Sequence, residues 1–215
     1  MTTYLQAVND VLLRLRESSV STVTSDAYSV LMGKYINDGK RQVEDAWDWN
    51  VLSTLVTVTT TASTSTYTVT GSGIRQRGIA VNDATNKVRL RNVPLQWIID
   101  QQQLSTVSTG IPVYYAWNGI DGTDSKVELY PTPGGTYSIK FNLIVPQAVL
   151  SSDSTDITVP SEPIVAYAVA LAKAEKGEDG SLASSEAYLL YKSILSDYIS
   201  LEKERFVEFD CFVVT

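Results

Sequence analysis

The sequence contains no histidine and only one cysteine, Cys211, among its 215 residues. Without histidine there can be no Ser-His-Asp triad, no Cys-His pair and no imidazole ligand for a metal ion. A single cysteine cannot form an internal disulfide or a thiolate cage. Most familiar hydrolases and zinc enzymes are therefore excluded, and we expect packing alone to stabilise the fold.

Long apolar runs are missing as well. The longest, around Ile164 to Ala172, is far shorter than the ~20 residues that span a bilayer. The first residues, Met1 to Glu17, contain polar side chains throughout, unlike the apolar region of a signal peptide. We therefore expect a soluble protein, made and used in the cytoplasm or carried in a particle that is assembled there.

Basic residues are outnumbered, with 17 lysines and arginines against 24 aspartates and glutamates, which gives a net charge of -7. The net charge is -2 over residues 1–52, +2 over residues 53–149 and -7 over residues 150–215. An acidic chain is repelled by phosphate backbones and by anionic lipid. The sequence thus argues against nonspecific binding to nucleic acid or membrane.

Apolar residues recur at helical spacing near both ends of the sequence. They predict helices over Tyr4 to Glu17 and Asp26 to Asn50, joined as an antiparallel pair, with Gly39 permitting a close helix crossing. A third predicted helix runs from Pro160–Pro163 to about Gly177, and a fourth spans Ser181 to Arg205.

The middle of the sequence is typical of strands. Twelve of the eighteen residues from Ser53 to Thr70 are serine or threonine, interleaved with aliphatic and aromatic residues, which predicts a hairpin with a Ser/Thr tip. A strand with one solvent-exposed face is predicted at Lys87 to Arg91, and a short helix is predicted at Pro94 to Leu104. Alternating residues between Val113 and Val145 predict a three-strand meander.

Together these elements predict an α+β fold in which the N- and C-terminal helices form a bundle that carries an inserted antiparallel β domain. The expected parts are an N-terminal helical hairpin over residues 1–52, a β-rich insertion over residues 53–149 and C-terminal helices over residues 150–205. An apolar arm follows over residues 206–215.

Motifs for chemistry are few. Gly71, Gly73 and Gly78 miss the spacing of a dinucleotide-binding turn, and no Walker-type phosphate loop occurs. The segment Asp121–Asp124 lacks the register of a calcium loop, and the acidic residues near position 45 favour a solvated ion-pair face with Arg41. We therefore predict no catalytic residue, no cofactor and no metal site.

Two surfaces remain as binding candidates. A basic set with little opposing acid is either a solvated strand face or a docking patch for an acidic partner; its members are Arg75, Arg77, Lys87, Arg89 and Arg91. The segment 206–215 either packs as an edge strand on its own domain or forms an arm for a neighbouring subunit or a partner. Its apolar residues are Phe206, Val207, Phe209, Phe212, Val213 and Val214.

The first fifty-two residues resemble a known family. The likeness rests on four separated pieces: AVNDVL at residues 7–12, VST with SDA at residues 20–27, RQVE at residues 41–44 and WDWN at residues 47–50. In this respect the sequence resembles the tail tubular protein A, or head-to-tail adaptor, family of short-tailed bacteriophages (podoviruses). The loop Arg16–Ser19 departs from the Gly-Glu-x-Pro turn to which that family tends.

The resemblance implies a non-enzymatic structural protein of the virion, located at the head-tail junction. Such adaptors form a ring, usually of twelve subunits, between the portal protein and the tail nozzle protein, in some cases near a tail fibre. DNA passes through the ring without being read. The alternative from the residues alone is a carbohydrate- or surface-binding β module on a helical stalk, with Tyr114, Tyr115 and Trp117 as an aromatic face.

Overall fold

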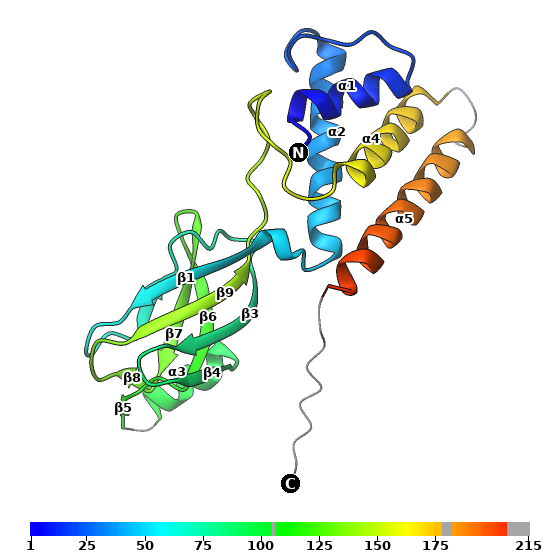
Figure 1. The fold of residues 1–215 in the computed structure, drawn as a ribbon. Helices are drawn as coiled ribbons and strands as arrows, with labels where there is room; N and C mark the ends of the chain where they lie inside the picture. The colour runs from blue at the N-terminus through cyan, green and yellow to red at the C-terminus, as the bar shows by residue number, and fades with distance from the viewer. Residues whose placement is uncertain (105, 178–181, 206–215) are drawn as a thin grey trace. The chain divides into compact units, whose positions relative to one another are not determined.

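The computed structural model describes residues 1–104, 106–177 and 182–205 (Figure 1). The chain forms two compact units. Residues 1–51 and 147–215 make the helical unit, and residues 52–146 make the β unit. The fold is a mixture of helices and a large, mostly antiparallel sheet, so the predicted α+β class is confirmed.

The helical unit contains α1 (Tyr4–Arg14), α2 (Ala27–Ala46), α4 (Ser161–Lys176) and α5 (Leu182–Lys203). Capping boxes start the first two helices, since Thr3 and Gln6, and likewise Asp26 and Ser29, exchange side-chain-to-backbone hydrogen bonds. Both helices end earlier than the sequence predicted. At the end of α2 the backbone of Trp47 is extended, with φ of -152°.

Helix α4 lies between α2 and α5 and also contacts α1 (Figure 1). At the α2–α4 crossing, a Cβ atom added to Gly39 would lie 3.0 Å from the Ile164 carbonyl oxygen. The two helix backbones can therefore approach only because this residue has no side chain. The close crossing predicted from Gly39 is confirmed, and its partner is α4.

We expect Gly39→Val to lower the free energy of unfolding by about 1 to 2 kcal/mol, because the added branches overlap α4 and force the helices apart. Chemical denaturation followed by circular dichroism at the helical band measures the loss. Gly39→Ser is the matched variant at the same position, and we expect it to cost less because its side chain is smaller and unbranched. An equal loss in Gly39→Ser and Gly39→Val would contradict a size-dependent clash.

Polar side chains of α2 hold the chain where it re-enters the helical unit. The Lys40 ammonium donates to the Glu44 carboxylate at 3.1 Å and to the Gln147 carbonyl at 2.7 Å. The Glu44 carboxylate accepts the Gln147 amide at 3.0 Å. Asn37 exchanges two hydrogen bonds with the backbone of Leu150, at 2.8 and 3.1 Å. The Lys40 and Glu44 side chains are 4% and 0% exposed, so this is a buried ion pair.

The β unit is built on a seven-stranded sheet with the order β1-β9-β3-β4-β6-β7-β2. Its strands are β1 (Ser53–Thr59), β2 (Thr66–Thr68), β3 (Arg77–Asp83), β4 (Val88–Asn92), β6 (Tyr114–Asp121), β7 (Asp124–Tyr130) and β9 (Ser138–Ile144). The remaining elements are the short turn η1 (Asn50–Leu52), the helix α3 (Leu95–Gln103) and the two-stranded pair β5 (Thr109–Gly110) with β8 (Thr132–Pro133).

Two strand pairings predicted from the sequence are wrong. Strands β1 and β2 do not form a hairpin: β1 pairs with β9, and β2 pairs with β7. The predicted meander holds only for β6 and β7, because its third strand, β9, lies between β1 and β3. The β4–β6 pair is parallel, so the seven-stranded sheet is not wholly antiparallel, and the separate β5–β8 pair is parallel as well. Matching of inward apolar residues over long sequence separations decides these pairings.

One face of the sheet encloses a single core, to which six of the seven strands contribute buried side chains. These include Val58, Val81, Leu90, Tyr115, Val127, Leu129, Ile139, Phe141 and Leu143. The other face is divided. Helix α3 covers it over β6 and β7, where the ring of Trp97 packs against Tyr114 at 4.9 Å and Tyr130 at 5.5 Å. Among the described residues of the β unit, no helix covers that face over β1, β9, β3 and β4.

Candidate functional site

The uncovered part of the sheet carries positive charge. One row of directly paired residues crosses β1, β9, β3 and β4, and its members are Thr57, Lys140, Asn82 and Arg89. Arg91 lies two residues further along β4. We call this surface the open face. The outward residues of its four strands include Leu55, Thr57, Thr59, Ala80, Asn82, Arg89, Arg91, Ser138, Lys140 and Asn142. None of these residues is acidic, although the chain as a whole is.

The structure brings only part of the predicted basic set together. Arg89 and Arg91 are exposed and point away from the buried Leu90, so both lie on the open face. Lys87 is exposed in the turn before β4, with φ of 59°. Arg75 and Arg77 are half-buried and have interaction partners, so they are not free cations.

Lys140 belongs to the open face, yet the sequence analysis did not include it. Its neighbours in sequence, Ile139 and Phe141, are fully buried, so the alternation along β9 turns Lys140 outward. That alternation was visible in the sequence. Its position beside Asn82 and within one row of Arg89 depends on long-range pairing, which no local pattern shows.

Glu128 is a buried carboxylate beneath α3, only 6% exposed. It accepts hydrogen bonds from the hydroxyls of Ser65 and Thr66, both at 2.6 Å, and from the amides of Gln102 and Asn118, both at 3.1 Å. Burial raises the pKa of this carboxyl, but the four hydrogen bonds outweigh it and hold the pKa below its ordinary value.

These contacts give Glu128 a structural role. Four donors occupy its oxygens, and they come from the segment before β2, from β2, from α3 and from β6. Ionised and fully hydrogen-bonded, the carboxylate is a poor proton donor or nucleophile at neutral pH. Glu128 therefore fastens α3 and β2 to the sheet. This role was not predictable from the sequence, since a single glutamate in an alternating strand carries no local signal.

The segment Asp121–Asp124 forms a turn, as the sequence predicted. Asp124 accepts the backbone amides of Gly71 and Gly73, both at 3.0 Å, and these glycines have φ of 89° and 64°. Asp121 accepts the hydroxyl of Thr68 at 2.8 Å. The two aspartates are thus engaged in joining loops, and the glycines serve a tight turn.

The proposed aromatic face is not assembled. Tyr114 points to the side of the sheet that α3 covers, while Tyr115 is 6% exposed and lies in the core. Trp117 packs against Tyr115 and Phe141 at ring separations of 6.2 and 6.0 Å. Successive residues of a strand face opposite sides, so these rings cannot form one sugar-stacking platform. The structure removes the observation on which the carbohydrate-binding alternative rested.

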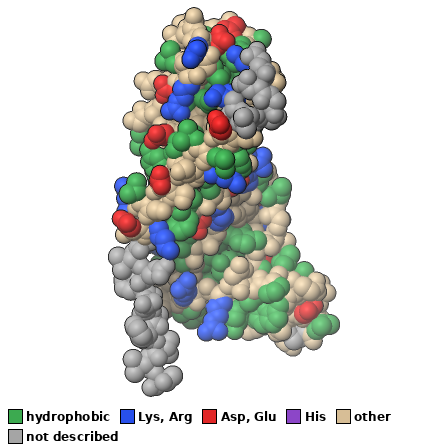
Figure 2. Space-filling model, turned by 90° about the vertical axis from the view of Figure 1, so that its right-hand side faces the viewer, with side chains coloured by type: hydrophobic (Ala, Val, Ile, Leu, Met, Phe, Trp, Pro, Cys, Tyr) green, Lys and Arg blue, Asp and Glu red, His purple; other side chains and the backbone are tan. Residues whose placement is uncertain are grey.

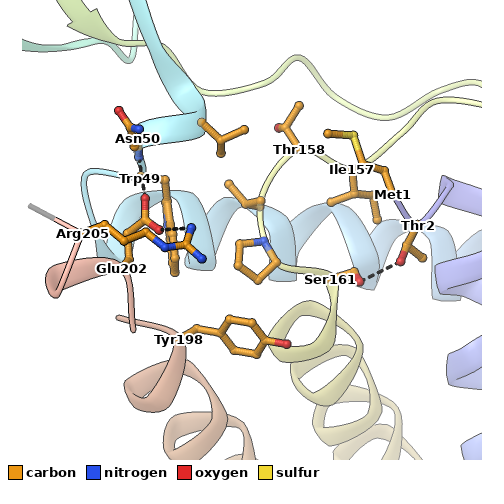
Figure 3. A pocket seen from close by; sticks show the side chains of 13 residues that line it. Met1, Thr2, Trp49, Asn50, Ile157, Thr158, Ser161, Tyr198, Glu202 and Arg205 are labelled. Carbon is orange, nitrogen blue, oxygen red and sulfur yellow. Dashed lines mark hydrogen bonds and ion pairs between the residues drawn. The ribbon is translucent and has the colours of Figure 1, made fainter. Parts of the chain in front are cut away.

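The helical unit has a pocket of about 600 Å³ between α5, the segment after α2 and the strand-like segment before α4 (Figure 3). Its wall is mixed: Trp49, Ile157 and Val159 are apolar and almost fully buried, and polar residues such as Thr158 and Ser161 also line it. On its rim, Glu202 accepts the Asn50 amide at 3.1 Å and pairs with Arg205 at 3.3 Å. These contacts tie the end of α5 to η1, and they offer no acid-base pair.

Helix α5 leaves apolar side chains exposed. Tyr191 is buried against α4, where its ring lies 5.0 Å from that of Tyr167. Leu189, Leu190 and Leu201 are 66%, 56% and 57% exposed. Figure 2 shows hydrophobic side chains lying among acidic and basic ones on this side of the molecule. A helix that is apolar beyond its buried face is typical of a surface that packs against another protein.

Within the described residues, no cluster of three or more carboxylates and cysteines is placed to hold a metal ion. No helix in the same part of the chain is long and apolar enough to cross a bilayer.

The chain also matches a known protein family over most of its length. Residues 2–207 match the family described as SU10 adaptor protein. The chain belongs to the SU10 adaptor protein family. A search of curated proteins gives no match. The family match covers nearly the whole chain, including both units, whereas the resemblance noted in the sequence covered only the first fifty-two residues.

Membership in the SU10 adaptor family makes this chain a bacteriophage adaptor, a structural component of the virion that joins head and tail proteins. Proteins of this kind are typically not enzymes. The narrower likeness to tail tubular protein A stays a prediction. The predicted arm, Phe206–Thr215, lies outside the described residues, and all but its first two residues lie outside the family match.

Proposed function

We propose that this adaptor forms a ring, of twelve copies, between the portal protein and the tail nozzle protein, and that DNA passes through its lumen without sequence-specific binding. The family match over residues 2–207 is the observation that carries the proposal. The acidity of the chain supports it, because a negative lumen repels the phosphate backbone and lets DNA move.

Subunit packing in the proposed ring uses the helical unit. The exposed leucines of α5 supply apolar area that the isolated chain leaves in water. The open face, with Arg89, Arg91 and Lys140, is suited to an acidic surface of the nozzle on the tail side. The segment 206–215, rich in phenylalanine and valine, docks on a portal or a neighbouring subunit.

The direct test mixes the purified full chain with portal rings of the same phage and measures co-sedimentation. The adaptor is expected to travel with the portal at a fixed ratio. A variant that lacks residues 206–215 is expected to keep its helical circular dichroism and to lose this association. Failure of the full chain to bind its portal contradicts the proposed function, whereas unfolding of the shortened chain favours packing of the segment on its own domain.

Charge reversal tests the open face separately. The double variant Arg89→Glu with Lys140→Glu is expected to weaken nozzle binding at least tenfold, about 1.4 kcal/mol, because two attractive contacts become repulsive. Lys126→Glu is the matched control, since Lys126 lies on β7, outside the open face. Surface plasmon resonance against nozzle protein measures both variants. Equal binding by the double variant and the control would contradict a docking role for the open face.

A further inference from the structure

Strand β1 is an edge strand of the β unit. It lies at the margin of the seven-stranded sheet, and its seven residues pair only with β9 among the described strands. Its sequence, STLVTVT, contains no charged residue and no proline. The strand at the opposite margin, β2, has only three residues.

An edge of this kind is a template for another strand. Proteins usually protect a long edge strand with lysine, proline, a bulge or a covering segment, because its unpaired backbone groups can otherwise hydrogen-bond to strands of other chains. No bulge interrupts the β1–β9 register from Ser53 to Thr59. The edge is therefore suited to accept one further strand of about seven residues.

The segment 206–215 has the sequence pattern of such a strand. Alternate residues Val207, Phe209, Cys211 and Val213 are all apolar, while the other set holds both acidic residues, Glu208 and Asp210, together with Phe206, Phe212 and Val214. Alternation with β-branched and aromatic residues is typical of a strand that buries one face. Its ten residues suffice to cover the seven of β1.

The two faces of the edge match the two faces of the segment. On the inner side of β1, Val56 and Val58 pack on the core. On the outer side lies the open face, whose charges are all positive. A strand with Val207, Phe209, Cys211 and Val213 inward extends the core and places Glu208 and Asp210 on the open face, with Phe206, Phe212 and Val214 on the same side. Lys140 is then two strands away, roughly 10 Å, within the range of electrostatic attraction.

We propose that residues 206–215 of one copy add as an edge strand to β1 of a neighbouring copy. The proposal rests on the proposed ring, and it identifies the partner of both the segment and the edge. One chain carries the donor and the acceptor at different places, so successive copies join head to tail and close into a ring. Backbone hydrogen bonds supply the affinity, and the alternation of side chains fixes which face turns inward.

Cys211 provides the test, because it is the single cysteine of the chain and belongs to the inward set. A cysteine introduced on the inner side of β1, Thr54→Cys or Val56→Cys, can reach Cys211 of the added strand at disulfide distance. Leu55→Cys and Thr57→Cys are matched controls on the outer side of the same strand. Each full-length variant is assembled with portal rings, oxidised with oxidised glutathione and analysed on a non-reducing gel.

We expect a ladder of covalent multimers from at least one inner-side variant and no ladder from the outer-side controls. Equal ladders from both sides, or none from either while rings form on the portal, would overturn the strand pairing and leave the adaptor function standing. A fast-migrating linked monomer would show pairing within one chain and overturn the exchange between copies. Failure to bind the portal, with the inner-side ladder still present, would instead contradict the adaptor function and leave the pairing between copies standing.

Discussion

Replacing Lys40 with methionine is expected to lower the free energy of unfolding of the helical unit by about 3 to 5 kcal/mol. The substitution removes the cation that pairs with Glu44 at 3.1 Å and leaves a carboxylate that is 0% exposed. It also removes the donor to the Gln147 carbonyl, at the point where the chain returns from the β unit. Urea denaturation followed by helical circular dichroism measures the change.

Two further variants separate charge from packing. Lys40→Met combined with Glu44→Leu removes both charges, and we expect it to recover part of the loss, because no unpaired carboxylate is left in the interior. The recovery is incomplete, since the amide and the carbonyl of Gln147 lose their side-chain partners. Arg41→Met is the surface control, since Arg41 and Asp45 lie 4.0 Å apart with both side chains exposed, and we expect a loss below about 1 kcal/mol. A double variant as unstable as Lys40→Met would contradict the account.

Replacing Glu128 with glutamine is expected to destabilise the β unit by about 1.5 to 3 kcal/mol at neutral pH. The amide keeps one acceptor oxygen, but its NH₂ group replaces the other, which accepts either Ser65 and Gln102 or Thr66 and Asn118, so one hydroxyl and one amide donor lose their acceptor. Hydrogen exchange followed by mass spectrometry on peptides from residues 52–146 measures this loss in the β unit alone.

The same carboxylate predicts a pH dependence. The pKa of Glu128 is lower in the folded protein than in the unfolded chain, so its stabilisation is fully present above the unfolded pKa, about 4.3. It is lost as the pH falls through the folded pKa. The wild type should therefore lose stability on acidification below about pH 4 more steeply than Glu128→Gln. Parallel pH profiles of the two proteins would show that Glu128 is not the group responsible.

Local patterns in the sequence were enough to predict the helices and the fold class. Gly39 is an instructive example, because a glycine inside an amphipathic helix predicts a close crossing, and Ile164 fills the space where a Cβ would lie. The short helix over Leu95–Gln103 and the turn at Gly71–Gly73 also agree with their local signals. In each of these cases the sequence signal lies within a few residues or on one face of a helix.

Strand pairing could not be predicted from local sequence patterns. β1 and β9 are separated by about eighty residues in sequence, and only the match of Val56 with Phe141 and of Val58 with Ile139 explains why they pair. The open face and the site of Glu128 follow from such pairings. A basic cluster was predictable from Arg89 and Arg91, but Lys140 joins them only once β9 is placed beside β3.

The mass of the complex between the full chain and its portal ring tests the central claim most directly. Native mass spectrometry of the purified complex should give one portal ring with twelve copies of this 23.6 kDa chain. Class averages of the same sample should show a second ring stacked on the portal with an open lumen. A portal that binds no copies of this chain, or a scattered number of copies without a closed ring, would contradict the account.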